Sequence, residues 1–159
     1  MELNVPVLPF AISLDLVMRL LGATLAGLVL GLDREVRGYG AGLRTHAIVC
    51  LAAALAAVTA IALFYALGGT QTRSDPLRVI EGTAAAIGVI AAALIFIGER
   101  SVRNLTSATY LWLVATIGIA FGAGLYPVAL IGTVLGLLLL TVARMFEDKP
   151  FGAHDDGQG

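Results

Sequence analysis

The sequence has little charge and almost no cysteine. Only 13% of its 159 residues are Asp, Glu, Lys or Arg, whereas a soluble domain carries about 25%. The formal net charge of −1 gives no basis for binding nucleic acid. A single cysteine, Cys50, excludes an intrachain disulfide and a cysteine-rich metal site. No basic segment precedes the first apolar run, so the sequence predicts no cleaved signal peptide.

Apolar residues fill the rest of the chain. They make up 58% of it, with a mean hydropathy of +0.92, so the surplus apolar surface must face lipid. The sequence therefore predicts an all-α fold, a polytopic transmembrane helix bundle of about five helices at about 20 residues each. The expected helices cover residues 13–32, 45–67, 77–98, 106–122 and 128–145. An alternative joins the last two into one re-entrant hairpin, because each is near the lower length limit for a span.

The predicted spans also set the domain organisation and the orientation. We expect an extracytoplasmic N-terminal segment at residues 1–12, a transmembrane domain at 13–146 and a disordered cytoplasmic tail at 147–159. With five helices, one side carries Arg34, Arg37, Arg44, Arg100, Arg103, Arg144 and Lys149, and the other carries Arg19, Arg73 and Arg78. The positive-inside rule places the more basic side and the C-terminus in the cytoplasm, and the N-terminus outside.

Charge is concentrated in one connector, residues 31–46, between two long apolar runs. Charged groups at helix ends are partly desolvated, so we expect them to be paired. The predicted polar network at the cytoplasmic end consists of Asp33, Arg34, Glu35, Arg44, His46 and Glu99. Arg44 is the expected centre, because a planar guanidinium binds a carboxylate and helix-end carbonyls together. His46 has two interpretations, an interfacial residue that anchors its helix or a proton-sensing member of the network.

A second polar group is expected in the outer leaflet. Asp15 and Arg19 are four residues apart and so share one helix face. They form either an interfacial ion pair, with Arg19 extended toward water, or a polar site inside the bundle. Arg78 and Glu81 share one face of the third predicted helix.

Glycines at a four-residue spacing mark two predicted helix-packing faces. Gly27 and Gly31 form one pair, and Gly118 and Gly122 form the other. In lipid, helix association depends on close packing, which small residues permit. We therefore expect these glycines at helix–helix contacts, within the protomer or between protomers.

The sequence carries none of the common catalytic signatures. It has no nucleophile elbow, Walker loop, dinucleotide fingerprint or His-x-x-x-His pair. We therefore expect no enzymatic activity, no catalytic residue, no cofactor and no metal site. A cation path would require Thr24, Thr83 and Thr116 to line one seam between the outer and inner acids.

Three segments resemble parts of a known family. RLLGATLAGLVLGLDRE, which begins at Arg19, is followed by AGLRTHAIVCLAAAL, which begins at Ala41. Together they resemble the amino-terminal signature of the MgtC/SapB family of bacterial membrane proteins. VRNLTSATYLW, which begins at Val102, resembles a second family segment. The sequence departs from the pattern at Asp33, where the family usually has Glu.

The resemblance implies a small regulatory protein of the bacterial inner membrane. The family is associated with survival at low magnesium, acid-stress adaptation, virulence and inhibition of the membrane ATP synthase. Such a protein would act by binding other membrane proteins in the lipid bilayer, and a homo-oligomer is expected. The alternative function is an oligomeric transporter of Mg²⁺, protons or another solute. Many relatives also carry a soluble C-terminal domain, which we expect this chain to lack.

Overall fold

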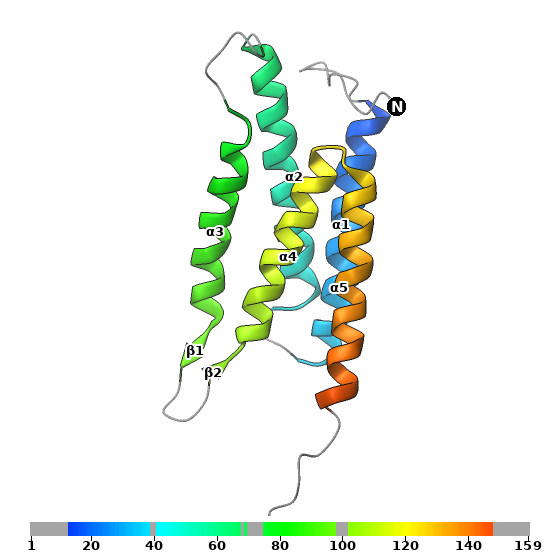
Figure 1. Cartoon of the computed structure of the whole chain (residues 1–159), viewed down its shortest axis with the longest axis vertical. Coiled ribbons are helices and arrows are strands. Elements are labelled where there is room, and N and C mark those ends of the chain that lie inside the picture. The colour runs from blue at the N-terminus through cyan, green and yellow to red at the C-terminus, as the bar shows by residue number, and fades with distance from the viewer. Residues whose placement is uncertain (1–12, 39–40, 68, 70–74, 98–101, 148–159) are drawn as a thin grey trace, which may run out of the picture.

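The structure is a computed structural model, and it describes residues 13–38, 41–67, 69, 75–97 and 102–147. These residues form five helices and one pair of two-residue strands, arranged as an elongated bundle (Figure 1). The elements are α1 (Leu14–Val36), α2 (Leu43–Ala66), α3 (Arg78–Leu94), β1 (Phe96–Ile97), β2 (Val102–Arg103), α4 (Leu105–Gly122) and α5 (Tyr126–Glu147). The prediction of an all-α transmembrane bundle of about five helices is confirmed.

Helix α1 begins where the sequence places a capping residue. The Ser13 hydroxyl accepts a hydrogen bond from the Leu16 amide at 3.1 Å, and Asp15 lies in the first turn, where the helix dipole favours an acid. The helix continues one turn beyond the predicted end at Leu32, through Val36. Part of the predicted connector is therefore helical.

Helix α3 is shorter than predicted. It ends at Leu94, not Gly98, because the chain turns into an antiparallel strand pair in which Phe96 lies opposite Arg103. Asn104, in the left-handed conformation at φ 63°, donates a side-chain hydrogen bond to the Leu94 carbonyl at 3.2 Å. Asn tolerates this conformation better than most residues, and its amide satisfies a carbonyl at the end of α3.

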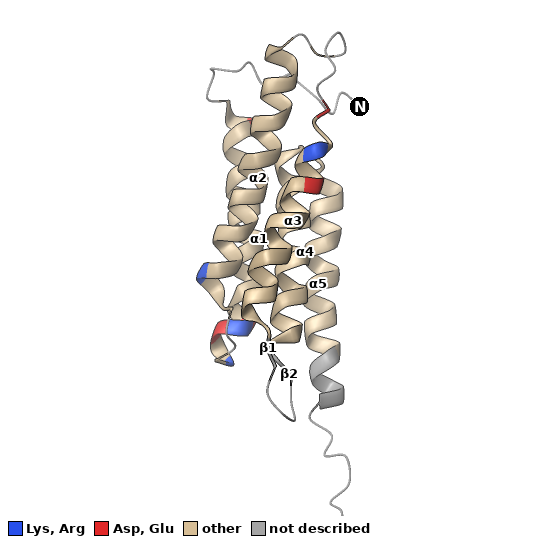
Figure 2. Ribbon diagram, turned by 90° about the vertical axis from the view of Figure 1, so that its left-hand side faces the viewer, with Lys and Arg blue, Asp and Glu red and all other residues tan. Residues whose placement is uncertain are grey.

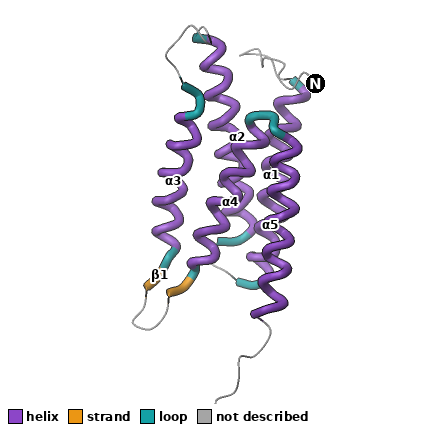
Figure 3. The backbone as a smooth tube through the Cα atoms, viewed as in Figure 1, coloured by secondary structure: helices purple, strands orange, loops and turns teal. Residues whose placement is uncertain are grey.

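Helices α1, α2 and α4 pack together, and α5 lies against α4 and α1, while α3 stands at the edge of the bundle (Figures 1 and 3). Helices α4 and α5 run antiparallel along the bundle, as expected both for two spans and for a re-entrant hairpin, so the re-entrant alternative stays open. By length and composition, three described helices can cross a membrane, namely α1, α2 and α4. Helix α3 has 17 residues, at the lower limit for a span of about 17–25 residues.

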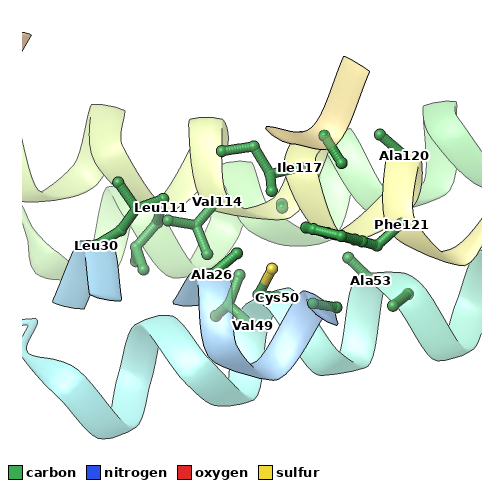
Figure 4. Close-up of a cluster of buried hydrophobic side chains, with 14 of the residues drawn as sticks. Ala26, Leu30, Val49, Cys50, Ala53, Leu111, Val114, Ile117, Ala120 and Phe121 are labelled. Carbon is green, nitrogen blue, oxygen red and sulfur yellow. The ribbon is translucent and has the colours of Figure 1, made fainter. Parts of the chain in front are cut away.

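The core is built from small and medium-sized apolar side chains. Leu30, Cys50, Leu111 and Val114 are fully buried, and the Cys50 sulfur lies among them between α1, α2 and α4 (Figure 4). Large apolar side chains on the outward faces are exposed, as expected where lipid is the solvent. The exposed ones on α5 include Leu130, Ile131, Val134, Leu135, Leu138 and Leu139.

The four glycines at a four-residue spacing all lie at contacts with α2. A Cβ atom at Gly27 would stand 2.6 Å from the His46 carbonyl oxygen and 2.8 Å from the Ala47 Cα. One at Gly31 would stand 2.7 Å from the Leu43 Cα. On α4, Cβ atoms at Gly118 and Gly122 would collide with the backbone carbonyl oxygens of Cys50 and Ala54. These faces are therefore occupied within the protomer.

Candidate functional site

Charged residues gather toward the two ends of the helices, and the middle of the bundle is uncharged (Figure 2). Two arginines of α1 are nevertheless buried: Arg19 is 3% exposed and Arg34 is 4% exposed. A buried arginine in a membrane protein is costly and generally faces protein groups that pair with it. We therefore take the surroundings of these two residues as the candidate site.

Arg34 is held by the first turns of α4. Its Nη2 atom donates to the Ser107 hydroxyl and, at 3.3 Å, to the Thr106 hydroxyl. Its guanidinium carbon lies 5.6 Å from the centre of the Tyr110 ring, which adds a cation–π contact. The Tyr110 hydroxyl donates to the Gly136 carbonyl on α5 at 2.9 Å. This group, Arg34 with Thr106, Ser107 and Tyr110, is called the inner arginine cluster below.

His46 lies in the same end of the bundle and is fully buried. Its Nδ1 is 2.8 Å from the Gly42 carbonyl oxygen, which can only accept, so Nδ1 carries the hydrogen. Its Nε2 is buried and has no hydrogen-bond partner within the described part of the chain. The ring therefore has one polar atom whose hydrogen-bonding capacity is unused, close to the contact between α1 and α2 at Gly31.

Arg19 occupies the equivalent place at the other end. Its Nε pairs with Asp15 at 2.7 Å, and its Nη1 donates to the Gly122 carbonyl at 3.0 Å. The Tyr126 hydroxyl of α5 donates to the same carboxylate at 2.7 Å. Gly124 has a φ of +76°, and a Cβ there would stand 2.9 Å from the guanidinium. The turn between α4 and α5 thus needs glycine for both its backbone and its contact with Arg19.

The two arginines fix the antiparallel register of α1 and α4. They are 15 residues apart on α1, and their partners Gly122 and Ser107 are also 15 residues apart on α4. At a rise of about 1.5 Å per residue, 15 residues of either helix span about 22 Å along its axis. This length is much of the depth of a bilayer core. A polar contact at each end therefore holds α4 against α1 across an apolar middle.

The carboxylates of the first connector have separate partners. Asp33, whose side chain is mostly buried, pairs with the more exposed Arg37 at 3.1 Å. Glu35 accepts a hydrogen bond from the Leu43 amide at 3.0 Å, so a side chain of α1 caps the first turn of α2. The N-cap residue of α2 is Gly42, which has no side chain for this role, and a Cβ there would collide with the Glu35 carboxylate.

We predict that Glu35→Ala destabilises the protein by about 1 kcal/mol, the usual effect of losing a helix cap. Its free energy of unfolding in detergent should fall by more than that of Arg37→Ala, because Arg37 is more exposed and its ion pair is worth less than about 1 kcal/mol. Chemical denaturation followed by circular dichroism measures both. Equal losses in the two variants would show that the Glu35 contact does not cap α2.

Other predicted site residues lie apart from these contacts. Arg44 is exposed, and its side chain makes no hydrogen bond or ion pair with another described residue. The buried arginine at this end is therefore Arg34 rather than the expected Arg44. Glu99 lies outside the described residues, as do the predicted N-terminal segment and nearly all of the predicted tail. Arg78 and Glu81 are exposed on α3, and the hydrogen bonds of the Arg19 side chain go to Asp15 and Gly122 instead.

Sequence reasoning missed the contributions of α4 and α5. Two residues on α4 and two around the start of α5 complete the arginine sites, and no sequence pattern marks them: Ser107, Tyr110, Gly124 and Tyr126. A signal for Arg34 was present, because it continues the inward stripe of α1. The buried residues of that stripe are Arg19, Ala23, Ala26, Gly27, Leu30, Gly31 and Arg34.

The arrangement offers cations and hydroxyl groups rather than metal ligands. Among the described residues, no group of three His, Cys, Asp or Glu side chains is placed to hold a metal ion. The inner arginine cluster presents a guanidinium, two hydroxyls and a phenol. Such groups hold helices together and bind anions or carboxylates.

Comparison with known proteins identifies the family. The model of the MgtC family matches residues 20–149, which include the inner arginine cluster, His46 and all four packing glycines. The chain belongs to the MgtC family. No solved structure matches it.

Three relatives show how far MgtC-family similarity extends. YhiD of Escherichia coli K12, whose name proposes a magnesium transporter, is 33% identical over 129 residues, 80% of this chain and 60% of YhiD. SrpB of Synechococcus elongatus is 35% identical over 87% of this chain and 80% of SrpB. MgtC of Salmonella typhimurium is 31% identical over 88% of this chain and 59% of MgtC. The chain thus spans about three fifths of YhiD and MgtC.

Proposed function

We propose that this membrane protein is a regulator of adaptation to low magnesium or acid stress in the bacterial inner membrane. It acts by binding other membrane proteins rather than by catalysis. Membership of the MgtC family supports the physiological setting, and the name of YhiD supports the link to magnesium. The family's association with virulence and with the ATP synthase makes the latter a candidate partner.

One observation carries the regulatory mechanism: the middle of the described protomer is closely packed. Between Arg19 and Arg34, α1 contacts α2 through Gly27, and α4 contacts α2 through Gly118. Leu30, Cys50 and Val114 fill the space between these helices with no exposed surface. The two polar ends are therefore separated by apolar side chains, and no polar seam joins them in the described part of the protomer. This packing supports a role exerted through the outer surface.

The second candidate function is a transporter formed by several copies, and the name of YhiD favours it. In that case the path would lie between protomers, because Thr24 and Thr116 each donate to a backbone carbonyl of their own helix. Such hydroxyls are already satisfied within the helix. Transport would require new polar surfaces at the contacts between copies.

A growth experiment tests the physiological role. Deletion of the gene should impair growth in medium with limiting Mg²⁺ or at acid pH, and the wild-type protein should restore it. Arg34→Ala should fail to restore growth at the same protein level in the membrane, whereas the exposed Arg37→Ala should succeed. Normal growth of the deletion strain in both media would contradict the proposal.

We also propose that the end of the bundle with Arg34, Arg37 and Arg44 faces the cytoplasm. Basic residues near membrane-spanning segments remain on that side. In a Cys50→Ala background, an impermeant thiol reagent applied outside the cell should label Leu67→Cys and not Val36→Cys. Both positions are exposed, at 60% and 79%, and lie at opposite ends of the bundle. Labelling of Val36→Cys from outside would reverse the orientation.

A further inference from the structure

Helix α3 has a long face with no partner among the residues that the structure describes. Its residues Arg78, Glu81, Ala85, Gly88 and Ala92 follow at alternating intervals of three and four, so they lie along one side of the helix. All five are exposed. This set is called the α3 seam. In contrast, Ile87 is buried toward α4, beside Ala115 and Thr116.

The α3 seam differs from the other glycine-containing faces of the bundle. A Cβ atom at Gly88 would meet nothing within 4 Å, whereas those at Gly27, Gly31, Gly118 and Gly122 would meet α2. Glycine inside a helix costs about 0.5–1 kcal/mol relative to alanine. Within the described part of the protomer, no packing at Gly88 offsets this cost. Small residues in a membrane helix allow a second helix to approach closely.

The charges at the start of the α3 seam indicate what kind of surface would complement it. Arg78 and Glu81 both lie in the first turn of α3 and are exposed, and neither side chain has a hydrogen-bond or ion-pair partner among the described residues. Where a second helix covers such charges, they are partly desolvated and favour pairing. A face with one cation and one anion is complementary to itself, because two-fold symmetry brings the same patch of each copy together.

We propose that the α3 seam is the surface on which a second copy of this chain docks. Two copies inserted in the same direction have their α3 helices side by side and parallel. Arg78 of each copy then lies about 4.5 Å, measured along the helix axis, from the level of Glu81 of the other. The long arginine side chain reaches this distance, so the symmetric contact makes two ion pairs. Below them, Ala85, Gly88 and Ala92 let the two α3 helices approach closely. The intervals of three and four favour a left-handed crossing of the two helices.

Oxidative crosslinking in native membranes tests the seam directly. Single cysteines are introduced in a Cys50→Ala background at three positions of the seam, Ala85→Cys, Gly88→Cys and Ala92→Cys. The control is Ala86→Cys, because Ala86 lines the groove between α2 and α3 instead. A disulfide requires Cα atoms within about 7 Å, so the crosslinked dimer at positions 85 and 92 should exceed that at 86 by about fivefold or more. Equal crosslinking at all positions, or none, would overturn the proposal.

Charge exchange separates self-association from binding of another protein. Arg78→Glu and Glu81→Arg each place like charges together, and each should weaken dimerisation by about tenfold or more. The double variant Arg78→Glu with Glu81→Arg keeps the net charge and restores both pairs, so dimerisation should recover. Failure of the double variant to recover, with thermal stability in detergent unchanged, would contradict a symmetric dimer. Crosslinking of seam cysteines to a different protein would do the same.

Discussion

Replacement of Arg34 by alanine is expected to destabilise the protein by about 3 kcal/mol or more. The change leaves the buried Ser107 hydroxyl and the Thr106 hydroxyl without their donor and removes the contact with the Tyr110 ring. An unsatisfied buried polar group costs about 1–3 kcal/mol, and loss of the side chain adds a cavity. The free energy of unfolding in detergent, from denaturant titration, measures the effect.

Arg37→Ala is the matched control for this prediction. Arg37 follows the last residue of the same helix, and its side chain is more exposed, so its pair with Asp33 should contribute less than about 1 kcal/mol. Arg34→Lys should recover only part of the lost stability, because an ammonium group keeps the charge but cannot reproduce the planar contacts of guanidinium. If Arg34→Ala and Arg37→Ala prove equally stable, the inner arginine cluster does not hold α4 against α1.

Gly27→Leu is expected to have a comparable or larger effect. A side chain there meets the backbone of α2 at the His46 carbonyl and the Ala47 Cα, which cannot move as a flexible side chain can. Forcing atoms into a packed core costs about 1–3 kcal/mol even where the surroundings adapt, and separation of two helix backbones should exceed this. Thermal unfolding in detergent and the yield of folded protein report the loss.

The control for Gly27→Leu is a glycine with open space. A Cβ at Gly82 on α3 meets nothing within 4 Å, so Gly82→Leu should retain the stability of the wild-type protein. The comparison separates the effect of close packing from the general effect of replacing a helical glycine. Full stability of Gly27→Leu would show that α1 and α2 are not in close contact at this position.

Much of the architecture could be predicted from the sequence because lipid imposes simple constraints. Apolar runs of span length with polar connectors fix the number of helices, and the glycine pairs mark faces that approach closely. The break after Leu94 could not be foreseen, because it depends on Asn104, ten residues later, which bonds to the Leu94 carbonyl. Boundaries set by such distant contacts leave no local pattern.

The choice between Arg34 and Arg44 shows what the sequence left open. Both arginines stand at helix ends, and the prediction of a central role for Arg44 rested on its chemistry alone. The structure buries Arg34 because it continues the inward stripe of α1 from Arg19 and Leu30, whereas Arg44 lies on the outer side of α2. The partners on α4 were hidden, because nothing local relates Ser107 to a residue 73 positions earlier.

The most direct test of the regulatory proposal is an ion-flux measurement on purified wild-type protein in liposomes. Fluorescent reporters of Mg²⁺ and of pH inside the vesicles should show influx equal to that of protein-free liposomes, with and without a membrane potential. This result follows if the closely packed middle of the bundle separates its two polar ends. Reproducible, saturable flux of Mg²⁺ or protons that depends on the protein would contradict the account and establish a transporter.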